Sequence, residues 1–360
     1  MNRILVVLPN WFGETLFATP FLRCLRQQRP EAFIATLGWP QCREVLLGNS
    51  SVDELIDYDE AATHRTLSGK RNLIRSLRSH RFDTVFILRK SLSRTLLAWL
   101  AGIPQRIGFA NAKSGWLLTR RIAPPSLPLP RLLHKSWDMR QTDLASNQAT
   151  WHKARSYLAL LGQNSSLSMA IRGYDYVVSD QERAAARDLL KTQEVDGHPF
   201  IVLHPAANWA HKRWPAERFS ALGDRLLTER SVMVVVTGGR DDVALADSVR
   251  TVMRQPVCML AGRTSLRVLA ACLEQAQLVV SNDTGVLHIA AALHRPLLAL
   301  YGPTSPFLTG PLGDSHSISV LHHPDCCPSI PCYAPEQPPH PGMSSISVDE
   351  AARAAMQLLD

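Results

Sequence analysis

Short continuous runs of apolar residues punctuate the first part of the chain, and segments with apolar residues at helical spacing separate them. Continuous runs of this length are typical of buried strands, and they lie at 4–8, 33–37, 83–88 and 106–109. The segments between them predict helices at 14–28, 40–47, 70–80 and 91–101. Pro20 lies inside the first of these helices and predicts a kink or a break there. Repeated strand–helix units predict a parallel sheet that is covered on both faces.

The same pattern returns in the second half of the chain. It predicts strands at 200–204, 232–236, 278–280 and 297–301, and helices at 215–228, 241–253, 266–272 and 348–359. In the middle, 123–133 contains four prolines and predicts an irregular loop, whereas 151–161 returns to helical spacing. The polar segment 162–180 is either a linker between domains or an ordinary long surface loop. Two doubly wound halves that face each other would place a cleft at the carboxyl ends of both sheets.

The segment 278–293, LVVSNDTGVLHIAAAL, has the clearest pattern in the chain. It predicts a strand, a polar turn and a helix, with Asp283 or Thr284 as N-cap and Gly285 where another group can approach the backbone closely. The start of a helix at the carboxyl end of a strand favours an anion, because its N–H groups and its dipole both attract negative charge. His288 lies one turn into the helix. A capped helix with a packed histidine accounts for these residues equally well.

Composition narrows the class of protein. A chain of 360 residues suggests two domains, and 46% hydrophobic with 19% charged residues is normal for a globular protein. No run approaches the ~18 apolar residues of a membrane span. The apolar run at 4–8 is too short for a secretory signal, so we expect a cytoplasmic protein. The net charge of +8 suggests an anionic partner, which nucleic acid, a phosphorylated sugar or an acidic lipid surface would satisfy.

The seven cysteines are scattered except near the end of the chain. An odd, scattered set does not predict a disulfide scaffold. Cys326, Cys327, Cys332 and His340 are close in sequence, but their spacing does not match the usual zinc patterns. We therefore expect no metal site there.

Two loops carry charged side chains that suit an enzyme. Glu14 follows the first strand, where a carboxylate can accept a proton from a substrate hydroxyl. A glutamate in a first helical turn also simply favours the helix dipole, which is the commoner case. Lys212 and Arg213 lie in the loop 205–214, PAANWAHKRW, and can neutralise phosphate charge. Two basic residues in a loop are more often a solvated surface.

A third loop contains Gly238 and Gly239, followed by Asp241 and Asp242. Glycines let a base or a ribose approach the backbone, and a carboxylate can bind ribose hydroxyls. A strand-to-helix turn that needs glycine is the simpler interpretation. The sequence has no Walker-type glycine–lysine loop and no complete G-x-G-x-x-G fingerprint.

Several motifs in order resemble the family 9 glycosyltransferases, the ADP-heptose:lipopolysaccharide heptosyltransferases, and especially their heptosyltransferase II group. The resemblance covers nearly the whole chain. The segments that carry it are SNDTGVLHIAAAL followed by LYGPTSP, ILVVLPNWFGETLFATPFLRCL, FILRKSLSRTLLAWLAGIPQRIGF, HKARSYLALLG, HPAANWAHKRWPAERF and the tail CCPSIPCY.

The resemblance implies a GT-B fold, which has two Rossmann-like domains with parallel sheets facing across a cleft. It implies an acceptor-binding domain at 1–165, a nucleotide-sugar-binding domain at 179–342, and a C-terminal helix at 343–360 that packs back on the first domain. The implied reaction is the inverting, metal-independent transfer of L-glycero-D-manno-heptose from ADP-heptose to the inner core of lipopolysaccharide. A different sugar donor or acceptor within the same family is the alternative.

Residue roles follow from the matching motifs. The resemblance implies that the donor diphosphate is held by Asp283, Thr284, Gly285 and His288. Lys212 would offset its charge as ADP leaves, and Gly238, Gly239 and a nearby acid such as Asp241 would lie near the adenosine. Glu14 would be the catalytic carboxylate. The family usually has aspartate there, so this side chain is longer by one methylene. Misplacement by ~1 Å can cost about 10²-fold in rate. The tail also departs from the family, with Gly342 and Met343 where a cysteine is usual.

The implied acceptor is an acidic glycolipid, Kdo-lipid A or its heptosylated form. Three basic residues in the first domain are our candidates for reaching it, although a solvated helix start accounts for them as well: Arg89, Lys90 and Arg94. The net charge of +8 suits peripheral association with an anionic inner membrane surface.

Two other classes of protein compete with the transferase. A dinucleotide-dependent oxidoreductase or epimerase would need the glycine fingerprint that is missing here. A nucleic-acid-binding protein would need clustered basic residues with exposed aromatic side chains, and we expect the lysines and arginines to be spread along the chain instead.

Overall fold

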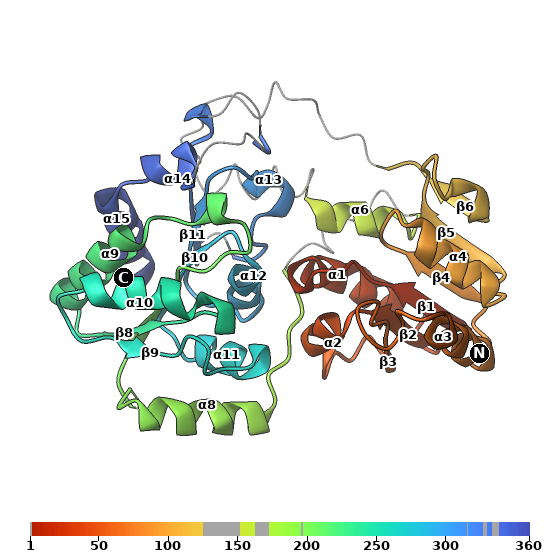
Figure 1. Cartoon of the computed structure of the whole chain (residues 1–360), viewed down its shortest axis with the longest axis horizontal. Coiled ribbons are helices and arrows are strands. Elements are labelled where there is room, and N and C mark those ends of the chain that lie inside the picture. The colour runs from red at the N-terminus through yellow and green to blue at the C-terminus, as the bar shows by residue number, and fades with distance from the viewer. Residues whose placement is uncertain are drawn as a thin grey trace. The chain divides into compact units, whose positions relative to one another are not determined.

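The computed structural model describes residues 2–124, 152–162, 173–195, 197–314, 316–326, 330–332 and 338–360. These residues form two compact units (Figure 1). The first unit contains 2–124, 153–162 and 173–177, and the second contains residue 152 and the described residues from 178 onward. Apart from residue 152, the second unit begins at residue 178, one residue before the expected start of the second domain at 179.

The first unit is built on a six-stranded parallel sheet in the order β3-β2-β1-β4-β5-β6. Its strands are β1 (Arg3–Val7), β2 (Phe33–Gly38), β3 (Glu54–Asp57), β4 (Thr84–Ile87), β5 (Gln105–Phe109) and β6 (Arg120–Ile122). Its helices are α1 (Phe12–Gln28), α2 (Pro40–Leu46), α3 (Leu67–Ser79), α4 (Leu92–Leu100), the short η1 (Gly115–Leu117) and α6 (Lys153–Ala159). β1 lies at the centre, where Ile4 pairs with Ile34 on one side and Thr84 on the other.

The second unit repeats this plan with the order β12-β11-β10-β7-β8-β9, again entirely parallel. Its strands are β7 (Phe200–His204), β8 (Met233–Val236), β9 (Cys258–Met259), β10 (Leu278–Asn282), β11 (Leu297–Tyr301) and β12 (Ile318–His322). Its helical elements are α8 (Asp180–Thr192), η3 (Ala210–Lys212), α9 (Ala216–Glu229), η4 (Arg240–Asp242), α10 (Val243–Val252), α11 (Leu266–Leu273), α12 (Gly285–Ala292), α13 (Pro306–Thr309), η5 (Pro324–Cys326), α14 (Pro341–Ser345) and α15 (Val348–Leu359).

Counted within each unit, both sheets have the strand order 3-2-1-4-5-6 of a Rossmann-type fold. In such a sheet the order reverses between the first and fourth strands, and ligands bind beyond the carboxyl ends of those two strands. The reversal lies between β1 and β4 in the first unit and between β7 and β10 in the second. These two places are therefore where the site residues should be sought.

The periodicity located the central strands but missed β3, β6, β9 and β12, and it also missed α8. All four of these strands lie at the sheet edges and are partly buried, so they lack a continuous buried apolar run. α1 continues through Pro20 without a break, and Pro20 is buried within it. The expected loop at 123–133 lies almost entirely outside the described residues.

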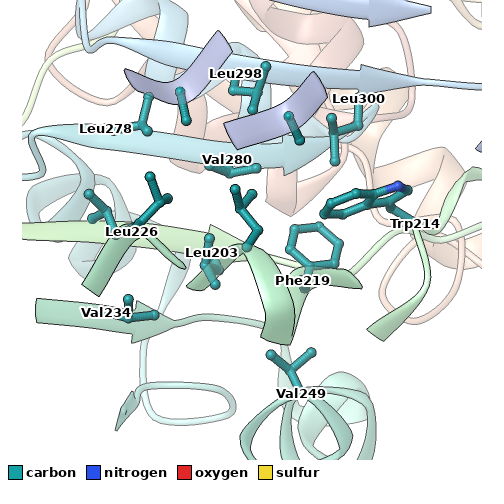
Figure 2. Close-up of a cluster of buried hydrophobic side chains, with 14 of the residues drawn as sticks. Leu203, Trp214, Phe219, Leu226, Val234, Val249, Leu278, Val280, Leu298 and Leu300 are labelled. Atoms are coloured by element: carbon teal, nitrogen blue, oxygen red, sulfur yellow. The ribbon is translucent and has the colours of Figure 1, made fainter. Parts of the chain in front are cut away.

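The core of the second unit is formed by side chains of the central strands and of the helices that cover them (Figure 2). Leu203, Val280 and Leu300 come from β7, β10 and β11, and Phe219 and Leu226 come from α9. All of these side chains are fully buried. Trp214 packs its ring edge-on against Phe219 at 5.1 Å between ring centroids, so the core reaches the loop that carries Lys212.

The C-terminal helix α15 packs within the second unit. Its alanines Ala351, Ala352 and Ala355 are fully buried in the core of the second unit. α15 packs on α9 and on strands β10, β11 and β12, where small side chains allow the helix to approach the sheet closely. The expected packing of 343–360 on the first domain stays a prediction.

None of the helices in the described part of the chain combines the length and the hydropathy that a membrane-spanning segment requires.

His204 and His288 are two of the buried histidines of the second unit. His204 ends β7, and its Nδ1 lies 2.9 Å from the hydroxyl of Thr237. His288 lies in α12 and is 2% exposed. Burial lowers the pKa of both imidazoles to about 4, because the charged form would lose its hydration. Both side chains are therefore neutral in the folded unit at pH 7.

We expect Ala355→Gln to destabilise the second unit by roughly 2–4 kcal/mol, because it overpacks the core and buries an amide. Arg353→Gln is the matched control, since Arg353 is exposed on the same helix. Calorimetric unfolding of the two variants checks this, and equal transition temperatures would mean that α15 is not packed as described.

We expect the stability of the second unit to fall as the pH falls from about 6.5 to about 4. In this window the unfolded chain binds a proton at His204 and at His288, but the folded unit does not. Each histidine contributes a slope of up to about 1.4 kcal/mol per pH unit. Urea unfolding across this range checks the slope. His204→Asn should reduce it, whereas His198→Asn, at an exposed position, should not.

Candidate functional site

An ion pair between a partly exposed ammonium and a buried carboxylate lies at the strand reversal of the second sheet. Lys212 follows β7 in the η3 turn, and Asp283 directly follows β10. The ammonium Nζ of Lys212 lies 2.6 Å from Oδ2 of Asp283. The hydroxyl of Thr304, which follows β11, donates to the same oxygen at 2.6 Å. Three loops thus meet at one carboxylate, at the place where a Rossmann-type sheet binds ligands.

The charges within this cluster are fixed by their surroundings. The Asp283 side chain is 6% exposed, and burial alone would raise its pKa. The ammonium of Lys212, the neighbouring His288 and the hydrogen bonds from Lys212 and Thr304 outweigh burial and hold the pKa of Asp283 below its ordinary value. Asp283 is therefore ionised at neutral pH. The Lys212 side chain is 23% exposed and can still reach a ligand.

The helix that follows begins as its sequence predicts. Thr284, rather than Asp283, is the N-cap, and its hydroxyl accepts a hydrogen bond from the backbone N–H of Val286 at 3.1 Å. Asp283 does not cap the helix, and its carboxylate faces Lys212 instead. The first turn of α12 presents backbone N–H groups that an α-helix leaves without intrahelical partners, so it attracts anions. His288 lies one turn further on and is buried and neutral.

The loop that carries Lys212 is fastened to β10 by Asn282, a residue that the sequence alone did not single out. Its Oδ1 accepts from the backbone N–H of Trp214 at 3.0 Å, and its Nδ2 donates to the carbonyl of Pro205 at 2.7 Å. The indole N–H of Trp214 donates to the carbonyl of Ile346 at 3.0 Å. In the sequence, Asn282 is a polar residue at the end of an apolar run. Such a residue predicts an ordinary turn equally well.

The glycine loop after β8 is a tight turn. A side chain at Gly238 would bring its Cβ within 2.9 Å of the Cβ of Asp242. The Asp242 carboxylate accepts from the N–H of Gly239 at 2.9 Å and lies 3.9 Å from the guanidinium of Arg213. Asp242 therefore has a structural role, while Asp241 is exposed and remains the acid that can face a ligand.

In the first unit, Glu14 lies in the first turn of α1, just beyond the central strand β1. Its carboxylate forms an ion pair with the ammonium of Lys153 at the start of α6, and the Glu14 side chain is 29% exposed. Burial, with a further contribution from the charge of Glu14, raises the pKa of Tyr157 well above its ordinary value, so this phenol stays protonated. The pairing with Lys153 spans 139 residues of sequence and had no local signal.

The structure separates the three basic candidates of the first unit. Arg89 and Lys90 are exposed in the loop after β4. Arg94 is 1% exposed, and its guanidinium donates to the carbonyl of Leu8 at 2.6 Å and lies 3.4 Å from the carboxylate of Glu60. It therefore holds the end of β1 in place and is poorly placed to reach an acceptor directly. The position of Arg94 in the sequence pattern did not show that its side chain points into the unit.

The cysteine-rich tail gives no metal site within the described residues, among which no group of three histidine, cysteine or acidic side chains is close enough to bind an ion. Cys326 is exposed, whereas Cys332 is buried. Cys327 lies outside the described residues. His340 caps α14 through its ring, which accepts from the N–H of Gly342 at 3.1 Å.

Comparison with known proteins identifies relatives over most of the chain. The profile of glycosyltransferase family 9 (heptosyltransferase) matches residues 70–337. Lipopolysaccharide heptosyltransferase 2 of Salmonella typhimurium is 29% identical over 329 residues, which cover 89% of this chain and 87% of that protein. Lipopolysaccharide heptosyltransferase 3 of Escherichia coli K12 is 28% identical over 302 residues, which cover 82% and 81%.

Solved structures agree with these relatives. The E. coli ADP-heptose LPS heptosyltransferase II has a TM-score of 0.77 and 25% identity, covering 99% of this chain and 98% of that chain. The family 9 glycosyl transferase of Veillonella parvula has a TM-score of 0.79 and 25% identity, covering 99% and 97%. These similarities confirm the predicted GT-B class with two Rossmann-like domains. They favour the transferase over the oxidoreductase alternative. The chain is an enzyme that belongs to glycosyltransferase family 9, the heptosyltransferases.

Proposed function

We propose that this enzyme transfers L-glycero-D-manno-heptose from ADP-heptose to the inner core of lipopolysaccharide, in the manner of a heptosyltransferase II. The relatives that match most of the chain are named for that activity. The observation that carries the proposal is the Lys212–Asp283–Thr304 cluster at the start of α12, because it supplies a cation and helix N–H groups where a sugar diphosphate needs them.

At the donor end, the roles differ among the residues of the cluster. A buried carboxylate repels phosphate, so Asp283 acts by holding the ammonium of Lys212 and the hydroxyl of Thr304 in place. The backbone N–H groups at Thr284 and Gly285 and the ammonium of Lys212 then face the diphosphate. Negative charge grows on the leaving phosphate as the anomeric C–O bond breaks, and these groups stabilise it. Neutral His288 packs beneath them, and the Gly238–Gly239 turn with Asp241 receives the adenosine.

At the acceptor end, Glu14 is the general base. The acceptor hydroxyl attacks the anomeric carbon from the side opposite the diphosphate, which inverts the configuration. Its proton passes to the Glu14 carboxylate while ADP departs with the electrons of the broken bond. Lys153 orients this carboxylate through the ion pair.

The acceptor, Kdo-lipid A or its heptosylated form, is anionic and anchored in a membrane. Arg89 and Lys90 are the exposed cations of the first unit that we assign to its phosphate or carboxylate groups. The enzyme would therefore work as a peripheral protein on the cytoplasmic face of the inner membrane, where the net charge of +8 favours anionic lipid.

We expect Glu14→Gln to lower kcat for heptose transfer by about 10²- to 10⁴-fold while ADP still binds, because the amide cannot accept the proton. Transfer from ADP-heptose to a truncated inner-core acceptor measures kcat, and calorimetry measures the Kd of ADP. Glu14→Asp is the control, since it keeps the carboxylate and moves it by about 1 Å. Wild-type turnover in Glu14→Gln would remove this residue from the mechanism.

We expect Lys212→Met to weaken ADP binding by about tenfold or more and to leave adenosine binding unchanged, because charge-assisted hydrogen bonds to the diphosphate are lost. Arg213→Met is the matched control, as Arg213 is the adjacent cation and lies near Asp242. Titration calorimetry with ADP and with adenosine checks both variants. An equal loss for the two ligands would place Lys212 away from the diphosphate.

A further inference from the structure

The outward face of α4 is apolar. Leu92, Leu96, Trp99 and Leu100 are 45%, 37%, 50% and 37% exposed. Their spacing of four, three and one residues places them on one side of the helix. The other side is buried and includes Leu97 and Ala98. A helix on the surface of a globular protein normally presents polar residues to solvent, so an exposed apolar stripe of this kind is unusual.

A second exposed aromatic side chain extends the stripe. Trp116 lies on η1, which packs beside α4, and its side chain is 67% exposed. Together these five residues are called the α4 face. They make up five of the eleven large apolar side chains that are exposed in the described part of the chain. Such a concentration on two adjacent elements marks an interaction surface.

The α4 face lies within a strongly cationic segment. Residues 61–124 contain thirteen lysines and arginines and one acidic residue, Asp83, which gives a net charge of +12. The whole chain carries only +8, so the remaining residues are net negative. Lys113 and Arg121 are exposed on the segment that carries Trp116. Arg78 of α3 donates to the carbonyl of Leu100 at 2.8 Å, which brings α3 and its cations to the end of α4.

We propose that the α4 face docks the enzyme on an anionic lipid bilayer, with the leucines and tryptophans entering the interface and the surrounding cations facing the lipid phosphates. The combination of an apolar face with a cationic surround is the chemistry of an interfacial helix. Nucleic acid would use the cations and tryptophans but has no place for three leucines. A second copy presenting the same face would be repelled by like charge. The inference rests on the proposed function, and it names the surface through which the enzyme reaches its membrane-borne acceptor.

Vesicle co-sedimentation tests this docking separately from catalysis. The intact enzyme is mixed with vesicles of phosphatidylcholine alone, or of phosphatidylcholine and phosphatidylglycerol in equal parts. We expect binding to the anionic vesicles that weakens as salt rises. Trp99→Gln with Trp116→Gln should weaken it on the order of tenfold. Lys113→Gln with Arg121→Gln should weaken it by a similar factor. Val252→Gln, at an apolar position of α10 that is likewise exposed, should leave it unchanged.

Activity on a lipid-free acceptor fragment completes the test. The double variants should keep wild-type turnover, because the α4 face takes no part in the chemistry. Equal binding to neutral vesicles, unchanged binding in both double variants, preferential binding of single-stranded DNA by this face, or self-association through it would each overturn the proposal. Vesicle binding without any heptose transfer would instead refute the proposed function and leave the docking intact.

Discussion

The ion pair between Lys212 and Asp283 is the interaction on which the loops at the strand reversal of the second sheet depend. A carboxylate that is only 6% exposed needs a cation beside it, and removing either partner of such a pair costs roughly 3–5 kcal/mol. The pair also connects the loops after β7, β10 and β11, through Lys212, Asp283 and Thr304. Because the Lys212 side chain is 23% exposed, the pair that joins these loops also leaves its ammonium accessible to solvent.

Each unit uses its strand reversal in a similar way. Glu14 follows the central strand β1 and pairs with Lys153, and Asp283 follows the central strand β10 and pairs with Lys212. In both units a helix begins within a few residues of the carboxylate. The difference lies in burial. Asp283 is enclosed and stays ionised, whereas the Glu14 side chain is 29% exposed.

Sequence periodicity predicted the elements that are buried on both faces, such as β1, β7 and β10, because a short continuous apolar run between polar turns is typical of a strand covered on both sides. Sequence periodicity failed for the features that are determined by tertiary contacts. The edge strand β6, RRI, has no apolar run, the inward direction of Arg94 depends on Leu8 and Glu60, and Lys153 meets Glu14 across 139 residues. The lysines and arginines were expected to be spread along the chain, but the segment 61–124 alone exceeds the net charge of the whole.

This chain has Glu14 where the family usually has aspartate, and the ion pair with Lys153 is relevant to that difference. A glutamate has one more rotatable bond, and an unheld carboxylate on that longer arm would sample positions more than an ångström apart. An ammonium on α6 restricts this arm, because the ion pair holds one carboxylate oxygen of Glu14 in place. Lys153 begins its helix and belongs to the same unit as Glu14, so their geometry is set within one rigid sheet and its helices. The longer side chain is thus held by residues of its own unit.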